Sequence, residues 1–353
     1  MEKTVIMGTE TPGRDGAGAA AVQETKEELL SIRELSICFR QYESGGGRRA
    51  FRQRTLPVIS GLSVTVRRGE IVAVVGASGS GKSLLAHAVL GLLPANALLE
   101  GSIRFRGREV EKQEKKKALF RTRESAGIPG IALVPQSVTW LDPLMKVGKQ
   151  VPGGRKTAEA RERMRTLFER YGLSEEVEEL YPHECSGGMI RRILLAAALM
   201  DGPELIIADE PTPGMDERLA QQAMDELRAF ADEKKGVLLI THDIELALRG
   251  ADRIAVFYAG TTVEVAPAAD FAREELLRHP YTRALWRAMP RNGFSPIEGS
   301  QPYAGQLPEG CVFQERCPFF TRDCRGEIPP KQVRGGLVRC IRCFEEEDMG
   351  RKC

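Results

Sequence analysis

A glycine-rich segment between an apolar strand and a helix constrains this chain most. Residues 76–83 read Gly-Ala-Ser-Gly-Ser-Gly-Lys-Ser and fit the pattern G-x-x-x-x-G-K-[ST]. An apolar run at 71–75 precedes the segment, and a helical pattern over 84–93 follows it. Glycines let backbone N–H groups turn toward bound phosphates, and the N-terminus of the next helix adds the positive end of its dipole. The segment therefore predicts a phosphate-binding loop in which Lys82 contacts the β- and γ-phosphates and Ser83 ligates Mg²⁺.

Polar residues end two further apolar runs. The run 205–208 is followed by Asp209 and Glu210, and the run 237–240 is followed by a threonine and then His242. In open α/β sheets, ligands lie beyond the carboxyl ends of the strands. We therefore expect Asp209 to bind Mg²⁺ and Glu210 to polarise an attacking water as a general base. His242 is expected to contact the γ-phosphate.

Two more segments can complete such a site. Gln136 follows the strand candidate 131–134 and offers a neutral amide that can coordinate Mg²⁺ and sense the γ-phosphate. Residues 185–189 read Cys-Ser-Gly-Gly-Met and precede a helical pattern over 190–200. The N-terminus of a helix is suited to an anion because its N–H groups are unpaired.

The remaining pattern predicts an α/β fold. Alternation in 62–66 indicates an edge strand, and the apolar runs indicate buried strands of a parallel sheet covered on both faces. Between the runs 131–134 and 205–208 the pattern is mostly helical, over 157–171 and 190–200. This stretch predicts an inserted helical subdomain.

Composition argues against a secreted, a DNA-coating or a transmembrane protein. The 353 residues suggest about two structural units, and 51 Lys and Arg against 49 Asp and Glu leave a net charge of +2. Such a balance creates no global field toward nucleic acid. The longest apolar run, 193–200, is far shorter than the roughly 20 residues of a membrane-spanning helix. Residues 1–28 are polar and rich in Gly, Ala and Thr, which predicts a disordered leader without a secretory signal.

The order of these motifs over residues 29–260 resembles the ATP-binding cassette (ABC) ATPases. The resemblance implies a P-loop ABC ATPase fold: a parallel-sheet RecA-like core, an antiparallel β lobe and an inserted helical subdomain at about 137–200. It implies ATP hydrolysis with Mg²⁺ as cofactor within a domain spanning 29–265. In that family two cassettes pair head to tail, and each ATP lies between the phosphate loop of one and the Ser-Gly-Gly segment of the other.

The resemblance also assigns roles to residues. The chain's own nucleotide would be served by Gly76, Ala77, Ser78, Gly79, Ser80, Gly81, Lys82, Ser83, Leu84, Gln136, Asp209, Glu210 and His242. Ser186, Gly187 and Gly188 would serve the partner's nucleotide. Asp216 is a further expected nucleotide-binding residue. Among these, Glu210, His242, Lys82 and Gln136 are the expected catalytic residues, and Ser83, Gln136 and Asp209 the expected Mg²⁺ ligands. Phe39 is the candidate for stacking on adenine, with Tyr42 as the alternative and a plain core role for Phe39 left open.

The segment after the cassette narrows the resemblance. His279-Pro-Tyr-Thr282, followed by Gly310-Cys-Val-Phe-Gln-Glu-Arg-Cys-Pro318, is similar to the ATPase subunits of oligopeptide, dipeptide and nickel importers. That likeness covers about 29–343 and implies a C-terminal extension over 266–353. The implied partners are a second ATPase subunit, two integral membrane permeases and an extracytoplasmic substrate-binding protein. In the resembled systems the second ATPase is usually a different chain, although a second copy of this chain stays open. The helical insertion after Gln136, into which residues 137–151 lead, is the expected docking surface for the permeases. The chain would work at the cytoplasmic face of the membrane, on peptides or nickel.

Two rival functions stay open at this point. One is a soluble ABC ATPase of repair, translation or iron–sulfur assembly, but the translation and repair types carry two cassettes and this chain has one phosphate loop. The other is a non-hydrolysing subunit that only regulates its partner. The presence of both Asp209-Glu210 and His242 argues against that reading.

Six of the eight cysteines lie in the last 43 residues. Structural zinc sites use short C-x₂₋₄-C pairs, and only Cys340 and Cys343 have that spacing. Iron–sulfur clusters accept more varied spacings. In the resembled subfamily some members carry a [4Fe-4S] cluster on the cysteines that match Cys311, Cys317, Cys324 and Cys340. A cluster, a zinc ion or free thiols all remain possible from the residues themselves.

Overall fold

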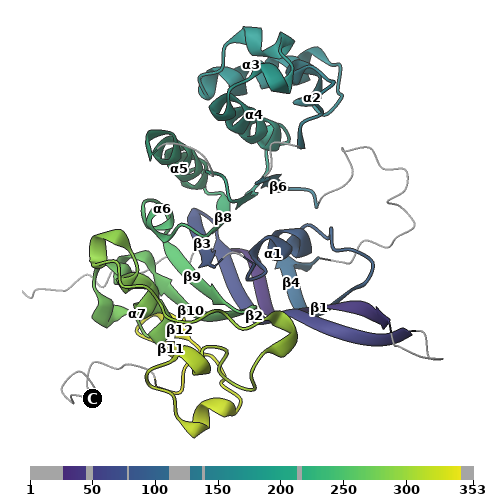
Figure 1. Cartoon of the computed structure of the whole chain (residues 1–353). Helices are drawn as coiled ribbons and strands as arrows, with labels where there is room; N and C mark the ends of the chain where they lie inside the picture. Colours follow the sequence, from purple (N-terminus) through teal and green to yellow (C-terminus); the bar gives the residue numbers. More distant parts are fainter. Residues whose placement is uncertain are drawn as a thin grey trace, which may run out of the picture.

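The computed structural model describes residues 27–44, 51–77, 79–110, 128–136, 140–212 and 217–342. A sheet of eight strands runs through the middle of these residues (Figure 1). In spatial order its strands are β11 (Lys331–Val333), β12 (Gly336–Val338), β10 (Thr261–Pro267), β9 (Arg253–Tyr258), β3 (Glu70–Gly76), β8 (Gly236–Thr241), β7 (Leu205–Asp209) and β6 (Ile131–Val134). Strands β9, β3, β8, β7 and β6 are parallel, and β10, β12 and β11 continue the sheet in antiparallel pairing.

A second sheet of four antiparallel strands lies against the first. Its order is β2 (Phe51–Arg67), β1 (Glu28–Ser44), β4 (Ala97–Phe105) and β5 (Arg108–Glu109). The predicted strand 62–66 is the last part of β2, which lies at the edge of this sheet as expected. Leu62, Val64 and Val66 are buried, which explains the alternation in the sequence.

The α-helices are α1 (Lys82–Val89), α2 (Val147–Gln150), α3 (Ala158–Arg170), α4 (Gly187–Leu199), α5 (Glu217–Asp232), α6 (Ile244–Leu248) and α7 (Pro280–Arg287). Short 3₁₀ turns occur at Glu175–Glu179, Pro182–Glu184, Ala268–Ala272, Glu274–Leu276, Pro290–Asn292, Ala304–Gln306, Gln314–Arg316 and Arg322–Arg325. Helices α2, α3 and α4 form a separate group between β6 and β7, at the top of Figure 1. This group is the helical insertion that the sequence predicts.

The central sheet is buried on both faces. Ile71, Ala73 and Val75 of β3 belong to one hydrophobic cluster, while Val72 and Val74 belong to another. Alternate residues of a strand point to opposite faces, so both faces of β3 are covered by apolar side chains. The continuous apolar run at 71–75 therefore forms a buried strand, as predicted.

Helix ends differ from the predicted ones because caps decide them. The helix expected over 84–93 begins at Lys82 and ends at Val89, shortly before Gly91, whose φ is 68°. The helix expected over 190–200 begins at Gly187, since the hydroxyl of Ser186 accepts a hydrogen bond from the N–H of Met189 at 3.2 Å. Strand β1 begins at Glu28, so the last residue of the expected leader is in the fold, and residues 1–26 lie outside the described part.

The C-terminal extension shares the central sheet. Strand β12 pairs with β10 through Glu264 opposite Val338 and Val265 opposite Leu337. The extension also contacts the antiparallel lobe, since Arg339, just after β12, donates to the carbonyl of Gly61 at 2.9 Å. Within the described residues, no helix combines the length and the apolar character needed to cross a bilayer.

Candidate functional site

Glycine is required at both ends of the loop between β3 and α1. A Cβ on Gly76 would lie 2.3 Å from the carbonyl oxygen of Phe257, on the neighbouring strand β9. Gly81 has a φ of 99°, in the left-handed region that glycine adopts without strain. The two glycines therefore allow the loop to pass close to β9 and then enter α1.

Lys82 closes this loop on itself. Its ammonium donates to the carbonyl oxygens of Gly76 and Ala77, each at 2.9 Å. Burial lowers the pKa of Lys82, and the nearby carboxylates of Glu210 and Asp209 raise it. The buried ammonium therefore stands between the start of the loop and two acidic side chains.

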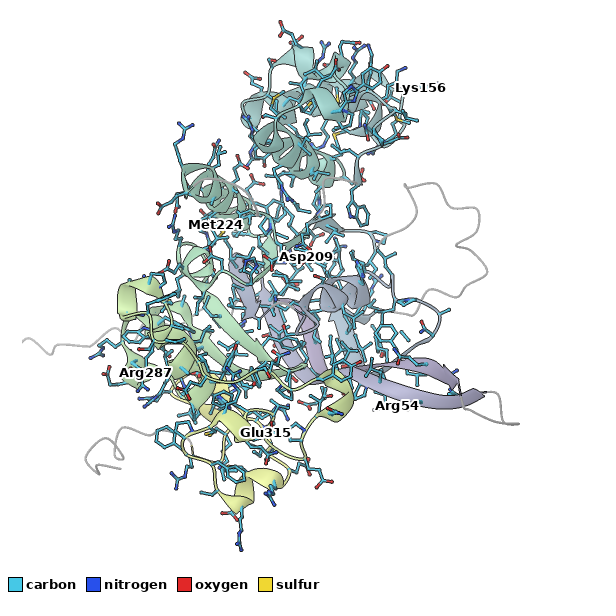
Figure 2. The ribbon with its side chains drawn as sticks, viewed as in Figure 1. Arg54, Lys156, Asp209, Met224, Arg287 and Glu315 are labelled. Carbon is cyan, nitrogen blue, oxygen red and sulfur yellow. The ribbon has the colours of Figure 1, made fainter. Side chains whose placement is uncertain are left out.

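Ser83 and Asp209 form a second contact at the start of α1. The Ser83 hydroxyl donates to Oδ1 of Asp209 at 3.2 Å, although the two residues are 126 positions apart. Burial raises the pKa of Asp209, and this hydrogen bond opposes the rise. Asp209 is the last residue of β7 and lies in the middle of the molecule, close to where the helical group meets the central sheet (Figure 2). A hydroxyl and a carboxylate are the oxygen donors that Mg²⁺ prefers.

Glu210 and His242 meet at the ends of β7 and β8. Both carboxylate oxygens of Glu210 lie 2.9 Å from Nδ1 of His242, and Thr241 donates to the same carboxylate at 3.4 Å. Glu210 has a φ of 47°, an uncommon conformation for a non-glycine residue, which is often associated with functional sites. The His242 side chain is 61% exposed and that of Glu210 only 10%. A carboxylate in this position can accept a proton from a water that approaches beside the exposed imidazole.

The other predicted residues lie around this centre in different ways. Gln136 is exposed and follows β6, whose Val134 pairs with Ala208, so it shares the sheet edge that carries Asp209. Ser186 and Gly187 are exposed at the start of α4, where Ser186 caps its own helix.

Phe39 is half-buried and packs against the hydrophobic cluster beside β1, which favours the core role that was left open for it. Its stacking on adenine stays a prediction. Ser78, Asp216 and the side chain of Tyr42 lie outside the described residues.

Sequence reasoning missed several neighbours of the site. Arg191 of α4 donates to the carbonyl of Pro135 at 3.2 Å, which ties the helical group to the segment just before Gln136. A pocket of about 410 Å³ borders Ala77 and His242, and its other walls include Tyr258 and Arg316. These residues belong to no motif, and only the tertiary fold brings them to the phosphate loop.

The His-Pro-Tyr-Thr segment is anchored on a buried carboxylate. Glu264 of β10 accepts hydrogen bonds from the backbone N–H groups of Arg278 and His279 and pairs with the Arg278 guanidinium at 3.2 Å. His279 then caps α7, because its Nδ1 accepts from the N–H of Tyr281 at 3.0 Å. Burial lowers the pKa of His279 to about 3. The motif therefore has a structural role at the junction between the sheet and the extension.

Four tail cysteines predicted as a set do meet at one place. Cys311, Cys317, Cys324 and Cys340 line a single small pocket that His279 also lines. Burial raises the pKa of Cys311 to about 11 and also raises that of Cys317. Within the described residues, no three Cys, His, Asp or Glu side chains are placed to hold one metal ion. Cys343, the second member of the short zinc-type pair, lies outside these residues.

Two family models match this chain. One described as "ABC transporter" matches residues 59–213, and one described as "Oligopeptide/dipeptide transporter, C-terminal region" matches residues 263–324. The first spans the phosphate loop, the helical group and β7. The second begins in β10 and includes the His-Pro-Tyr-Thr segment and three of the four pocket cysteines.

Relatives extend the match to most of the chain. It is 35% identical to the oligopeptide transport ATP-binding protein OppD of Salmonella typhimurium, covering 90% of this chain and 95% of that protein. It is 32% identical to the oligopeptide transport ATP-binding protein AppD of Bacillus subtilis, covering 85% and 94%. It is 33% identical to the dipeptide transport ATP-binding protein DppD of Escherichia coli, covering 85% and 92%.

Solved structures share the fold. The cbiO1 protein of Clostridium perfringens, part of an ABC transporter complex, aligns with a TM-score of 0.55 and 26% identity, over 74% of this chain and 99% of that one. A dimeric ATP-binding cassette bound to ADP and Pi, MJ0796, aligns with a TM-score of 0.54 and 24% identity, over 68% and 99%. The predicted fold class, with its parallel core, antiparallel lobe and helical insertion, is confirmed.

Proposed function

This chain belongs to the ABC transporter family of ATP-binding proteins, and from that premise we propose that it drives the import of peptides through separate membrane permeases. As a member of this family it is an ATPase that uses ATP with Mg²⁺. The peptide cargo is supported by the C-terminal match and by relatives named for oligopeptide and dipeptide transport. No observation favours nickel, the other cargo considered from the sequence.

The arrangement around Lys82 carries the proposal. Lys82 releases the carbonyls of Gly76 and Ala77 and contacts the β- and γ-phosphates. Glu210 accepts the proton of the attacking water, and His242, already 2.9 Å from that carboxylate, contacts the γ-phosphate. Ser83, Asp209 and Gln136 would hold Mg²⁺, which supplies charge neutralisation on the phosphates.

A second ATPase subunit completes the site in this proposal. Ser186 and Gly187 are exposed at the start of α4, as a surface that binds a neighbour's nucleotide requires. We assign the cassette to 29–265, its helical subdomain to about 137–200 and the extension to 266–353.

Transport itself tests the cargo. The chain is reconstituted in liposomes with its membrane permeases, partner ATPase and substrate-binding protein, and uptake of labelled peptides and of ⁶³Ni²⁺ is measured with and without ATP. ATP-dependent peptide uptake is expected. Uptake of nickel alone would contradict the cargo, and ATP hydrolysis without uptake of either would contradict the import function.

The loop that leads into α2 is the proposed permease-docking surface. Trp140, Leu144 and Met145 are three of the seven large hydrophobic residues that are exposed in the described part of the chain. The buried amide of Gln150 holds this loop, because it donates to the carbonyls of Asp142 and Met145 at 3.0 and 2.6 Å. A loop with a fixed shape and an apolar tip is suited to bind a partner at the cytoplasmic face of the membrane.

Leu144→Asp will weaken that contact. Its side chain is 87% exposed, so the substitution should leave the fold intact while placing a charge in an apolar interface. We expect loss of co-purification with the permeases, with ATP hydrolysis by the isolated ATPase pair unchanged. Phe294→Asp, at a residue that is 71% exposed on the C-terminal extension, is the matched control and should retain the permeases. Equal retention by both variants would contradict the docking surface.

The cysteine pocket supports a [4Fe-4S] cluster held by Cys311, Cys317, Cys324 and Cys340. All four ligands needed for a thiolate-bound cluster line one pocket, which fits this donor set. The pocket has a volume of about 10 Å³, so the segments that line it must separate to admit a cluster. The bound group would supply cross-linking of these segments or redox sensing, and the ATP chemistry does not require it.

Cys324→Ser will lower the iron content of the anaerobically purified protein. The buried thiol is one of four expected ligands, and its loss should reduce iron and acid-labile sulfide by at least half. Cys38→Ser, in β1 and outside the pocket, is the control and should leave both unchanged. Zinc in place of iron, or equal iron in both variants, would contradict the cluster.

A further inference from the structure

His279 carries a buried nitrogen that its helix-capping role does not use. The residue is 1% exposed, and its Nε2 is buried with no hydrogen-bond partner within the described structure. An unpaired buried polar atom costs free energy, so a native protein usually provides a partner for it. The cap on α7 needs only the other ring nitrogen, and so it does not explain why this position is a histidine.

The hydrogen-bond pattern fixes which nitrogen carries the proton. Nδ1 accepts from the N–H of Tyr281 at 3.0 Å, so its lone pair is engaged and it carries no hydrogen. A neutral imidazole then has its hydrogen on Nε2. Nε2 is therefore a donor, and the missing partner must be an acceptor.

The surroundings of His279 point to sulfur as that acceptor. The ring lines the pocket that Cys311, Cys317, Cys324 and Cys340 also line. It lines a second pocket as well, and Cys311 is common to both. In neither pocket does the described structure supply an oxygen or sulfur that bonds to Nε2.

We propose that His279 donates a hydrogen bond from Nε2 to a sulfur of the cluster site and thereby sets the reduction potential of the bound cluster. This inference rests on the proposed cluster. Hydrogen bonds to cluster or thiolate sulfur stabilise the reduced, more negative state and raise the potential. His279 would then contact three parts of the structure. Its backbone N–H donates to the buried Glu264, its Nδ1 caps α7, and its Nε2 would bond to the cysteine pocket.

Two substitutions of His279 separate the hydrogen-bond donor at Nε2 from the helix cap at Nδ1. His279→Asn keeps an oxygen close to the position of Nδ1 and can still cap α7, but it places no donor at the position of Nε2. His279→Gln reaches as far as Nε2 and can donate there, but it leaves the Tyr281 N–H without its cap. Iron and sulfide per chain are measured first, so that only fully loaded proteins are compared.

The readout is the midpoint potential of the cluster in an EPR-monitored redox titration. His279→Asn should shift the one-electron reduction equilibrium at least tenfold toward the oxidised form, which is about 59 mV more negative. His279→Gln should lie closer to the unchanged protein in potential and melt at a lower temperature. With ¹⁵N-labelled histidine, the reduced cluster should show a nitrogen hyperfine coupling that His279→Asn lacks.

The outcomes distinguish the two levels of the proposal. A loaded His279→Asn protein with an unchanged potential would overturn the role of Nε2 and leave the cluster in place; a water in the second pocket would then be its partner. An unchanged protein that contains neither iron nor sulfide would overturn the cluster and this inference together.

Discussion

Glu210→Gln will bind ATP but hydrolyse it about 10²–10⁴-fold more slowly than the unchanged chain, as expected for loss of a general base. Glutamine has the same length and can still bond to Nδ1 of His242, which lies 2.9 Å from the carboxylate. It cannot accept a proton from the attacking water. The substitution also removes a negative charge close to the phosphates, so nucleotide binding should be retained and the closed dimer favoured.

Steady-state phosphate release and ATP binding by calorimetry, both with the partner ATPase present, test this expectation. Glu233→Gln is a suitable control because Glu233 is partly exposed and pairs with Lys235 on the surface. It should hydrolyse ATP at the original rate. Turnover by Glu210→Gln equal to that of the control would remove Glu210 from its role, and loss of ATP binding would indicate a wider structural defect.

Arg278→Met will reduce the free energy of unfolding by about 3–5 kcal/mol, the usual cost of breaking a buried ion pair. The side chains of Arg278 and Glu264 are 1% and 0% exposed, and they pair at 3.2 Å. Arg278 also donates to the carbonyls of Val333 and Arg334, next to the strand that extends the sheet. Its removal leaves a buried carboxylate without its cation and frees the β11–β12 turn.

Urea denaturation followed by tryptophan fluorescence measures this loss. Arg287→Met is the matched control, because Arg287 lies on the same segment but is 56% exposed in its pair with Glu274. Its cost should stay below about 1 kcal/mol. Arg278→Met combined with Glu264→Gln should cost less than the two single substitutions added together, because the two residues interact. Equal costs for Arg278→Met and Arg287→Met would refute the importance of the buried pair.

The sequence predicted those elements whose side chains carry a periodic signal. Strand 131–134 has the predicted bounds, and the run 205–208 lacks only Asp209, because an uninterrupted apolar run defines a buried parallel strand. Helix ends were less accurate. The start of α4 depends on one side-chain hydrogen bond from Ser186, which an apolar pattern does not report.

The residues of the site also fall into those that the sequence could predict and those that it could not. Asp209, Glu210 and His242 could be predicted because they lie at the carboxyl ends of neighbouring strands of one parallel sheet, and such strand ends must meet. Ser83 could be predicted because it lies at the start of the helix that follows a third strand of the same sheet. Arg316 could not. It reaches Tyr258 at 3.0 Å from a loop 58 residues later, and no spacing in the sequence encodes that approach. The pairing of Glu264 with Arg278 was missed for a related reason, since isolated charges in a sequence read as surface residues.

Strands β12 and β11 cover the edge of the central sheet beyond β10. Without β12, the main-chain N–H and C=O groups of β10, a strand that is now buried, would face solvent, and such exposed strand edges lead proteins to aggregate. The tail is therefore not an accessory that can be trimmed or exchanged between relatives as a module. A chain that is shortened before β11, or that carries the tail of a relative, would need another hairpin paired with β10 in order to stay free of aggregates.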